Sequence, residues 1–209
     1  MYKLYYSPGA CSMAIHVALN EINAKFELEN VAMVGGEKSA KLLEVNPRGA
    51  VPVLKIDDFI LREGAAILIY LLDENKSELL PQSGLERAKA LEWLAFANST
   101  LHPAYSRLFF QRRVLGDKAS ENPLYKPSFE QVQKYWNEIE EQLNKAQFVC
   151  GDKITIADIL LTIIANWSFY FKEPINFGVK TKEFFSKIIV RPSFQKALEV
   201  ENVIYKANI

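Results

Sequence analysis

The sequence predicts an α/β domain followed by an all-helical domain, and three observations lead to this prediction. Short β-prone segments alternate with helical patterns over roughly the first 75 residues. From residue 86 onward, apolar residues recur almost continuously at steps of three and four, the period of a helix. The stretch between them, residues 75–85, is rich in polar and turn-forming residues. We therefore place a linker there and expect domains at residues 1–77 and 85–209.

The first domain should have the element order β-α-β-α-β-β-α. Its first three strands alternate with helices, and its last two follow each other directly, joined by a hairpin turn at Asp57-Asp58. This order is typical of a mixed sheet with helices on its faces. The expected elements lie at residues 2–6, 11–21, 25–33, 37–46, 51–57, 59–63 and 64–75.

The second domain should be a helical bundle built around one buried helix. The segment at residues 155–171 is apolar almost all round, which predicts a helix in the middle of the bundle. At its start, Thr155 and Asp158 fit an N-terminal capping box. Pro103 should kink another helix, because proline cannot donate a hydrogen bond to the Ser99 carbonyl. The clearest helical patterns cover residues 86–102, 128–146, 155–171 and 192–200.

Composition excludes several classes of function. Lys+Arg and Asp+Glu both number 25, and this neutral balance argues against bulk attraction to nucleic acid or to anionic membranes. We find neither an apolar run of about 18 residues nor the layout of a signal peptide. The two cysteines and two histidines form no metal-binding or dithiol motif, so we expect no metal and a cytoplasmic protein with reduced thiols.

The stretch NPRGAVPVL, residues 46–54, combines a turn with a strand entry. Pro52 suits the start of a strand, because proline cannot donate to the sheet ladder. Two interpretations remain open from these residues alone. An ordinary trans bond before Pro52 is the default. A cis bond would turn the backbone groups of Val51 outward, where they can pair with a peptide-like ligand.

The stretch REGAAILIYLL, residues 62–72, places Glu63 and Gly64 at a helix start. Free N–H groups there bind carboxylates, and Gly64 allows a close approach to the backbone. Glu63 can accept hydrogen bonds from an ammonium group. These two residues together can hold a zwitterionic amino-acid end, although Glu63 can equally serve only to complement the helix dipole.

Cys11 follows Pro-Gly-Ala at the start of the first helix, and it is either a reactive thiol or a small apolar filler. His102, beside Pro103, is either a cleft residue or a histidine at the edge of the core. We interpret His16 as structural and Cys150 as a buried small hydrophobe.

Five stretches in order resemble the cytosolic glutathione S-transferases, most closely the bacterial beta class. The resemblance spans nearly the whole chain, and it implies a thioredoxin-like N-terminal domain, a helical C-terminal domain and a homodimer. It also implies a cis Val51–Pro52 bond that grips the cysteinyl backbone of glutathione. The five stretches are KLYYSPGACSMAIHVALNE, NPRGAVPVL, EGAAILIYL, EWLAFANSTLH and FVCGDKITIADILL.

The resemblance also implies an activity and a site. The activity is conjugation of glutathione, as co-substrate, to small electrophiles, with glutathione-dependent thiol–disulfide exchange at Cys11 as a second possibility. Cys11 matches the cysteine that faces the glutathione thiol, and His102 matches a histidine of the active-site cleft. The implied glutathione-binding residues are Val51, Pro52, Glu63, Gly64 and Ser99.

Three positions depart from the family pattern. Ala95 stands where an asparagine is frequent, and Pro103 and Gly35 stand where lysines are frequent. These losses motivate an alternative function, that of a non-catalytic dimeric binding or regulatory protein of the same family. For the enzyme, we expect the helix start to lower the pKa of the Cys11 thiol. Cys11 then either steadies the glutathione thiolate through a hydrogen bond or bonds to its sulfur.

Overall fold

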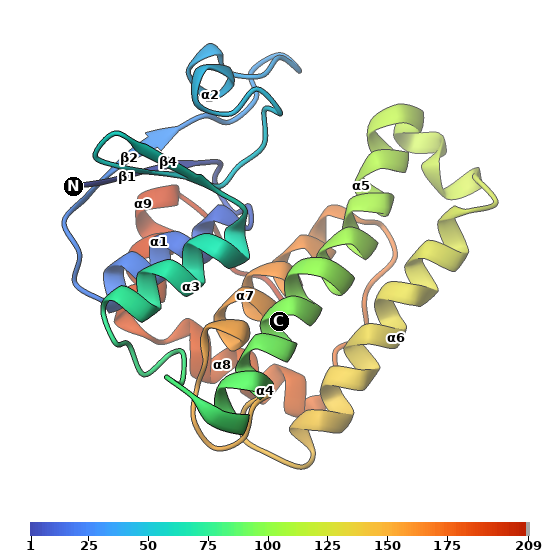
Figure 1. Cartoon of the computed structure of the whole chain (residues 1–209). Coiled ribbons are helices and arrows are strands. Elements are labelled where there is room, and N and C mark those ends of the chain that lie inside the picture. Colours follow the sequence, from blue (N-terminus) through green and yellow to red (C-terminus); the bar gives the residue numbers. More distant parts are fainter. Residues whose placement is uncertain (208–209) are drawn as a thin grey trace.

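The computed structural model describes residues 1–207 and has an α/β domain followed by helices (Figure 1). The predicted order β-α-β-α-β-β-α is confirmed, although most elements are shorter than their sequence patterns. The bounds are β1 (Tyr2–Tyr6), α1 (Ser12–Glu21), β2 (Phe26–Asn30), α2 (Ala40–Val45), β3 (Val53–Ile56), β4 (Phe59–Arg62) and α3 (Gly64–Glu74).

The four strands form one mixed sheet in the order β2-β1-β3-β4. The central strand β1 runs parallel to β2 and antiparallel to β3, and Leu4 is paired with a leucine on each side. Ile56 pairs with Phe59, so the turn between β3 and β4 consists of Asp57 and Asp58. Asp57 takes the positive φ of 50° that tight hairpin turns require, which confirms the predicted hairpin.

Alternate strand residues bury the two faces of this sheet. Leu4 and Leu54 face the large core, to which α1 and α3 also contribute. Their neighbours Tyr5 and Val53 face the other side, where Leu42 of α2 covers them. Figure 1 shows α1 and α3 on one side of the sheet and α2 on the other. Tyr5 pairs with Val53 and Val53 pairs with Arg62, so the chain leaves β1, enters β3 and leaves β4 at one edge of the sheet.

The helical domain is built around α7, in which all ten residues are buried, as its apolar sequence predicts. The amphipathic helix α8 was not singled out from the sequence. The elements are α4 (Gly84–Ala95), η1 (Phe96–Leu101), α5 (His102–Leu115), η2 (Gly116–Glu121), α6 (Tyr125–Leu143), α7 (Ile156–Ala165), η3 (Asn166–Tyr170), α8 (Val179–Ile189) and α9 (Pro192–Glu201).

The capping box predicted at the start of α7 is present. The backbone N–H of Thr155 donates to Asp158 Oδ2 at 2.6 Å, and the Thr155 hydroxyl donates to the same oxygen at 2.9 Å. Asp158 Oδ1 accepts from the backbone N–H of Val149 at 3.0 Å. Burial raises the pKa of the Asp158 carboxyl to about 6 despite these hydrogen bonds. One carboxylate therefore joins the helix start to the loop before it.

Pro103 is accompanied by an irregular helix, but the irregularity differs from a simple kink. α4, η1 and α5 follow one another without a break, and η1 is a π-helical turn. The His102 amide donates to the carbonyl of Ala97, five residues back. The next bond of that register would start at residue 103, and proline has no N–H to donate. The wide turn therefore ends at Pro103, and α-helical geometry resumes.

Among the described residues, none of the helices has both the length and the apolar character that crossing a membrane requires.

Candidate active site

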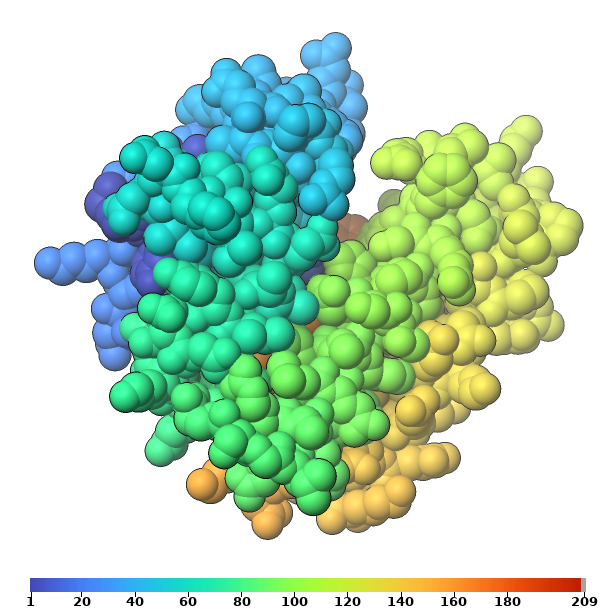
Figure 2. Space-filling view, in the orientation of Figure 1, coloured from blue at the N-terminus to red at the C-terminus, as the bar shows by residue number. Residues whose placement is uncertain are grey.

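A cavity of about 280 Å³ lies between the N-terminal domain and the helix run α4–η1–α5. Figure 2 shows the molecule hollowed between the blue-to-cyan domain and the yellow-green end of α5. The lining includes six residues that the sequence and the resemblance single out: Cys11, Val51, Pro52, Glu63, Gly64 and His102.

Ser99 does not line this cavity. Ser99 is exposed, and so is Ala95, which lies one helical turn earlier. Asn98 lines the cavity instead, together with His102 and Ser106. These three residues are spaced by four, so they share one face of the helix run. That spacing from His102 is the sequence signal that could have identified Asn98.

Cys11 lies at the N-terminal boundary of α1, where the loop from β1 enters the helix. The residue is half-buried, and its Sγ atom lies 3.8 Å from the Val51 carbonyl oxygen, to which the thiol can donate. The expectation that the helix start lowers the Cys11 pKa is wrong. Removal from water raises the pKa of the thiol to about 11, and this effect exceeds the opposing effect of the nearby backbone N–H groups. Cys11 is therefore a protonated thiol at neutral pH.

The loop that carries Cys11 is held by residues from the other end of the chain. The backbone N–H of Gly9 donates to Glu201 Oε2 at 2.9 Å, and the Gly9 carbonyl accepts from Trp167 Nε1 at 2.9 Å. Glu201 also pairs with Nδ1 of His16 at 2.9 Å, and both side chains are buried. His16 is thus structural, as predicted. Helices α7 and α9 of the second domain pack against α1, which brings these groups together.

Glu63 and Gly64 form the start of α3. Glu63 has a φ of 73°, a left-handed conformation that costs a residue with a Cβ atom about 1–3 kcal/mol. Its carboxylate accepts from Arg48 Nη1 at 2.7 Å at the rim of the cavity. The N–H groups of the first turn of α3, beginning with Gly64, have no acceptor within the helix. The start of α3 therefore combines backbone N–H groups that can bind an anion with a carboxylate that can bind a cation.

Gly64 leaves room in the cavity. A Cβ atom at this position would lie 3.5 Å from Pro52 Cγ and 3.7 Å from Asn98 Oδ1, within ordinary contact distance. The space is thus bounded by Pro52 on one side and by Asn98 on the other. The Val51–Pro52 bond is cis, as the resemblance implies.

His102 is packed edge-on against Trp167, with ring centroids 4.8 Å apart. Burial lowers the pKa of His102 below its ordinary value of 6.5, so the imidazole is neutral at pH 7. Trp167 therefore contacts His102 and, through its N–H, the Cys11 loop. Trp167 thus contacts both parts of the structure that carry the catalytic residues implied by the resemblance, His102 and the loop of Cys11.

Cys150 lies outside the cavity, but it is half-buried and in polar contact, so the prediction of a buried small hydrophobe is wrong. Its thiol is within 3.4 Å of the Thr155 hydroxyl at the start of α7. Burial raises the pKa of Cys150 to about 11.

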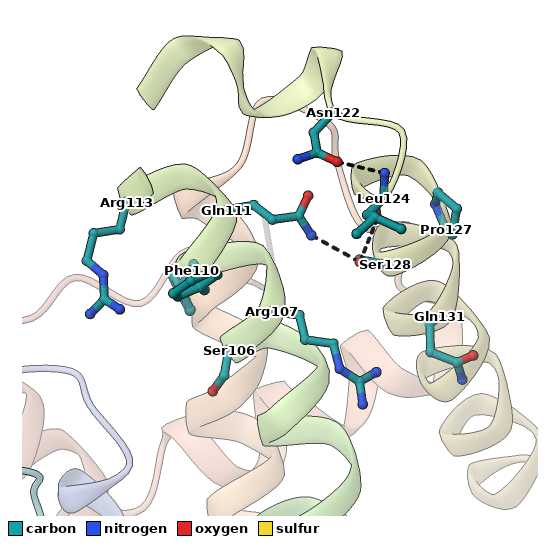
Figure 3. Close-up of a pocket in the computed structure, with 11 residues that line it drawn as sticks. Ser106, Arg107, Phe110, Gln111, Arg113, Asn122, Leu124, Pro127, Ser128 and Gln131 are labelled. Carbon is teal, nitrogen blue, oxygen red and sulfur yellow. Dashed lines mark hydrogen bonds between the residues drawn. The ribbon is translucent and has the colours of Figure 1, made fainter. Parts of the chain in front are cut away.

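A second hollow, of about 1120 Å³, lies between α5 and α6 near their connection (Figure 3). Gln111 points toward α6 and donates to the Ser128 hydroxyl at 3.1 Å. Phe110 and Leu124 border the hollow and are more than half exposed, at 57% and 68%. This end of the helical domain therefore presents an apolar surface.

Comparison with known proteins identifies the family. The model of the glutathione S-transferase N-terminal domain matches residues 1–73, and that of the C-terminal domain matches residues 61–192. Glutathione S-transferase GstA of Escherichia coli O157:H7 is 33% identical over 207 residues, covering 96% of this chain and 99% of that protein.

Solved structures agree with this result. The bacterial glutathione S-transferase BphK, in a ternary complex, has a TM-score of 0.84 at 33% identity and covers 96% of this chain and 100% of its own. A beta-class enzyme from Sphingomonas chungbukensis has a TM-score of 0.80 at 30% identity, with coverage of 97% and 100%. A sphingomonad enzyme complexed with glutathione has a TM-score of 0.81 at 32% identity, with coverage of 97% and 100%.

Proposed function

The chain belongs to the glutathione S-transferase family, of the bacterial type, and from this premise we propose how its residues carry out the transfer of glutathione to small electrophiles. Glutathione lies in the cavity between the domains. The Val51 backbone pairs with its cysteinyl residue, while Glu63 and the start of α3 hold the γ-glutamyl end. Its sulfur then lies beside Cys11, with His102 across the cleft.

Cys11 acts as a hydrogen-bond donor in this proposal. Glutathione loses its thiol proton to solvent, and the Cys11 S–H donates to the resulting thiolate, which lowers the pKa of the bound glutathione. The thiolate then attacks the electrophilic carbon, a C–S bond forms, and the leaving group departs with its electron pair. The observation that carries this assignment is the position of the Cys11 thiol, which lines the cavity next to the Val51 carbonyl. Burial raises the pKa of this thiol to about 11, which favours the protonated, hydrogen-bond-donating form.

Thiol–disulfide exchange at Cys11 is the less favoured reaction. Exchange requires the Cys11 thiolate as nucleophile, because the thiol itself does not attack a disulfide. A pKa of about 11 leaves very little thiolate at neutral pH. Conjugation needs only the protonated form, so the same burial that hinders exchange maintains the donor.

Replacement of Cys11 by serine and by alanine distinguishes the two roles. Serine keeps an O–H donor, so we expect C11S to retain conjugation of an aromatic electrophile within about tenfold, whereas C11A should lose more, since hydrogen bonds to charged groups contribute about 1.5–3 kcal/mol. The matched control is C150A, which should leave both activities unchanged. Equal conjugation rates for wild type and C11A would contradict the donor role. A glutathione adduct on Cys11 with full disulfide reductase activity would favour exchange.

We also propose that the protein is a cytoplasmic homodimer. The support for a dimer is the apolar surface around the hollow between α5 and α6, which a second copy of the chain would cover. Light scattering with chromatography should give twice the mass of one chain for wild type. L124E should shift the protein toward monomer, while V200E, on the exposed side of α9, should remain dimeric. A monomeric wild type would contradict this proposal.

A further inference from the structure

Several polar residues line the cavity although the sequence did not predict them as site residues. Asn98 differs from the others in its hydrogen bonding. Asn46 bonds to the Ala50 carbonyl, Arg62 to the Val45 carbonyl, and Ser106 to the His102 carbonyl. Arg48 is paired with Glu63. Within residues 1–207, the half-buried side chain of Asn98 has no hydrogen-bond partner. An amide with unused donors and an unused acceptor is therefore held in the wall of the cavity.

The position of Asn98 on the helix run places its amide in the cavity wall. Asn98 is in the middle of η1, and the five-residue register of η1 ends immediately before Pro103. Asn98 lies four residues before His102 and lines the cavity with it, while Ser99 is exposed.

The Asn98 amide faces the start of α3. Its Oδ1 atom lies 3.7 Å from the place where Gly64 would carry a Cβ, so the amide is adjacent to the first residue of α3, and both residues line the cavity. The first N–H groups of α3 suit the α-carboxylate of a γ-glutamyl group. The adjacent ammonium group has three donors and needs several acceptors. One oxygen of Glu63 accepts from Arg48, so the other oxygen is free for the ammonium, whose remaining N–H donors need further acceptors.

We propose that Asn98 Oδ1 accepts a hydrogen bond from the α-ammonium group of the γ-glutamyl residue, and that Asn98 thereby selects peptides with a free α-amino group at this end. Glu63 binds the same ammonium from the other side. This inference rests on the proposed glutathione site and names one recognition contact within it.

Binding of two peptides tests the contact. Glutathione and glutaryl-cysteinyl-glycine, which lacks only the α-amino group, are titrated calorimetrically into wild type and N98A. We expect N98A to weaken glutathione binding about tenfold or more, as for a hydrogen bond to a charged group. Binding of glutaryl-cysteinyl-glycine should change less than twofold. In steady-state assays, KM for glutathione should rise while kcat changes little.

Two further variants control this experiment. N98D keeps an acceptor oxygen of the same shape, so its glutathione affinity should stay closer to wild type than that of N98A. N144A removes an exposed asparagine at the end of α6 and should bind both peptides like wild type. Equal weakening of both peptides by N98A, or no weakening of either, would overturn the inference. Failure of wild type to bind glutathione at all would instead overturn the proposed site.

Discussion

At the residue scale, Glu63 shows a conflict between conformation and chemistry. Its φ of 73° suits glycine, yet its position at the rim of the cavity suits a carboxylate. A strained residue of this kind persists where the surrounding structure fixes it, and such residues cluster at ligand sites. The backbone therefore supports the assignment of Glu63 independently of the sequence pattern.

Replacement of Glu63 should separate these two effects. E63G relieves the left-handed strain and E63A does not, so we expect E63G to exceed E63A in free energy of unfolding by about 1 kcal/mol. Both variants should bind glutathione more weakly than wild type, because both lack the carboxylate. Urea unfolding and calorimetric titration measure the two quantities. An E63A protein as stable as E63G would show that the strain is absent in solution.

His102 should give a pH dependence of stability. Its folded pKa lies below the ordinary 6.5, so the unfolded chain takes up the proton first as the pH falls. The contribution of His102 is complete above pH 6.5 and is lost as the pH falls through the lower folded pKa. We therefore expect wild type to lose more stability than H102Q between pH 7 and pH 5. Parallel curves for the two proteins would contradict a buried neutral imidazole.

At the scale of elements, the sequence predicted well those features that depend only on residues close together in the chain. The strand β1, the hairpin at Asp57 and the capping box at Thr155 each depend on residues a few positions apart. The pKa of Cys11 was predicted in the wrong direction, because desolvation depends on what packs around the thiol. Asn98 lies four residues before His102, a spacing that places both on one helix face, but the family pattern pointed to Ser99 instead.

The capping box permits a prediction at this scale. D158A removes the acceptor for the N–H groups of Thr155 and Val149, and each buried donor left without a partner costs about 1–3 kcal/mol. We expect the free energy of unfolding, measured in urea, to fall by roughly 2–6 kcal/mol. D152A, in the exposed part of the same loop, should remain within about 0.5 kcal/mol of wild type. A small effect of D158A would mean that water replaces the lost acceptor.

At the scale of the whole molecule, the two domains meet at the loop that carries Cys11. Gly9 and Glu201 are 192 positions apart, and no local pattern connects them. The fold class was nevertheless predictable, because a change of hydrophobic period marks the two domains. What the sequence could not provide was the contact between them, which depends on how α9 packs against α1.

Removal of Glu201 should affect both stability and activity. E201A leaves the N–H of Gly9 and the buried His16 ring without their acceptor, which should lower the free energy of unfolding by roughly 2–6 kcal/mol. We expect conjugation to fall as well, because the loop before Cys11 loses its anchor. E199A, on the exposed side of α9, is the matched control and should change neither. Full activity in a destabilised E201A protein would show that Trp167 alone positions the loop.

The contact between Gly9 and Glu201 also has a consequence for synthesis of the chain. The sheet of the first domain and its helices can form while translation continues. Glu201 lies in α9 and leaves the ribosome 192 residues after Gly9. Until then the loop before Cys11 lacks this anchor. A nascent chain can therefore hold a folded first domain, but its active site is completed only after α9 has been released.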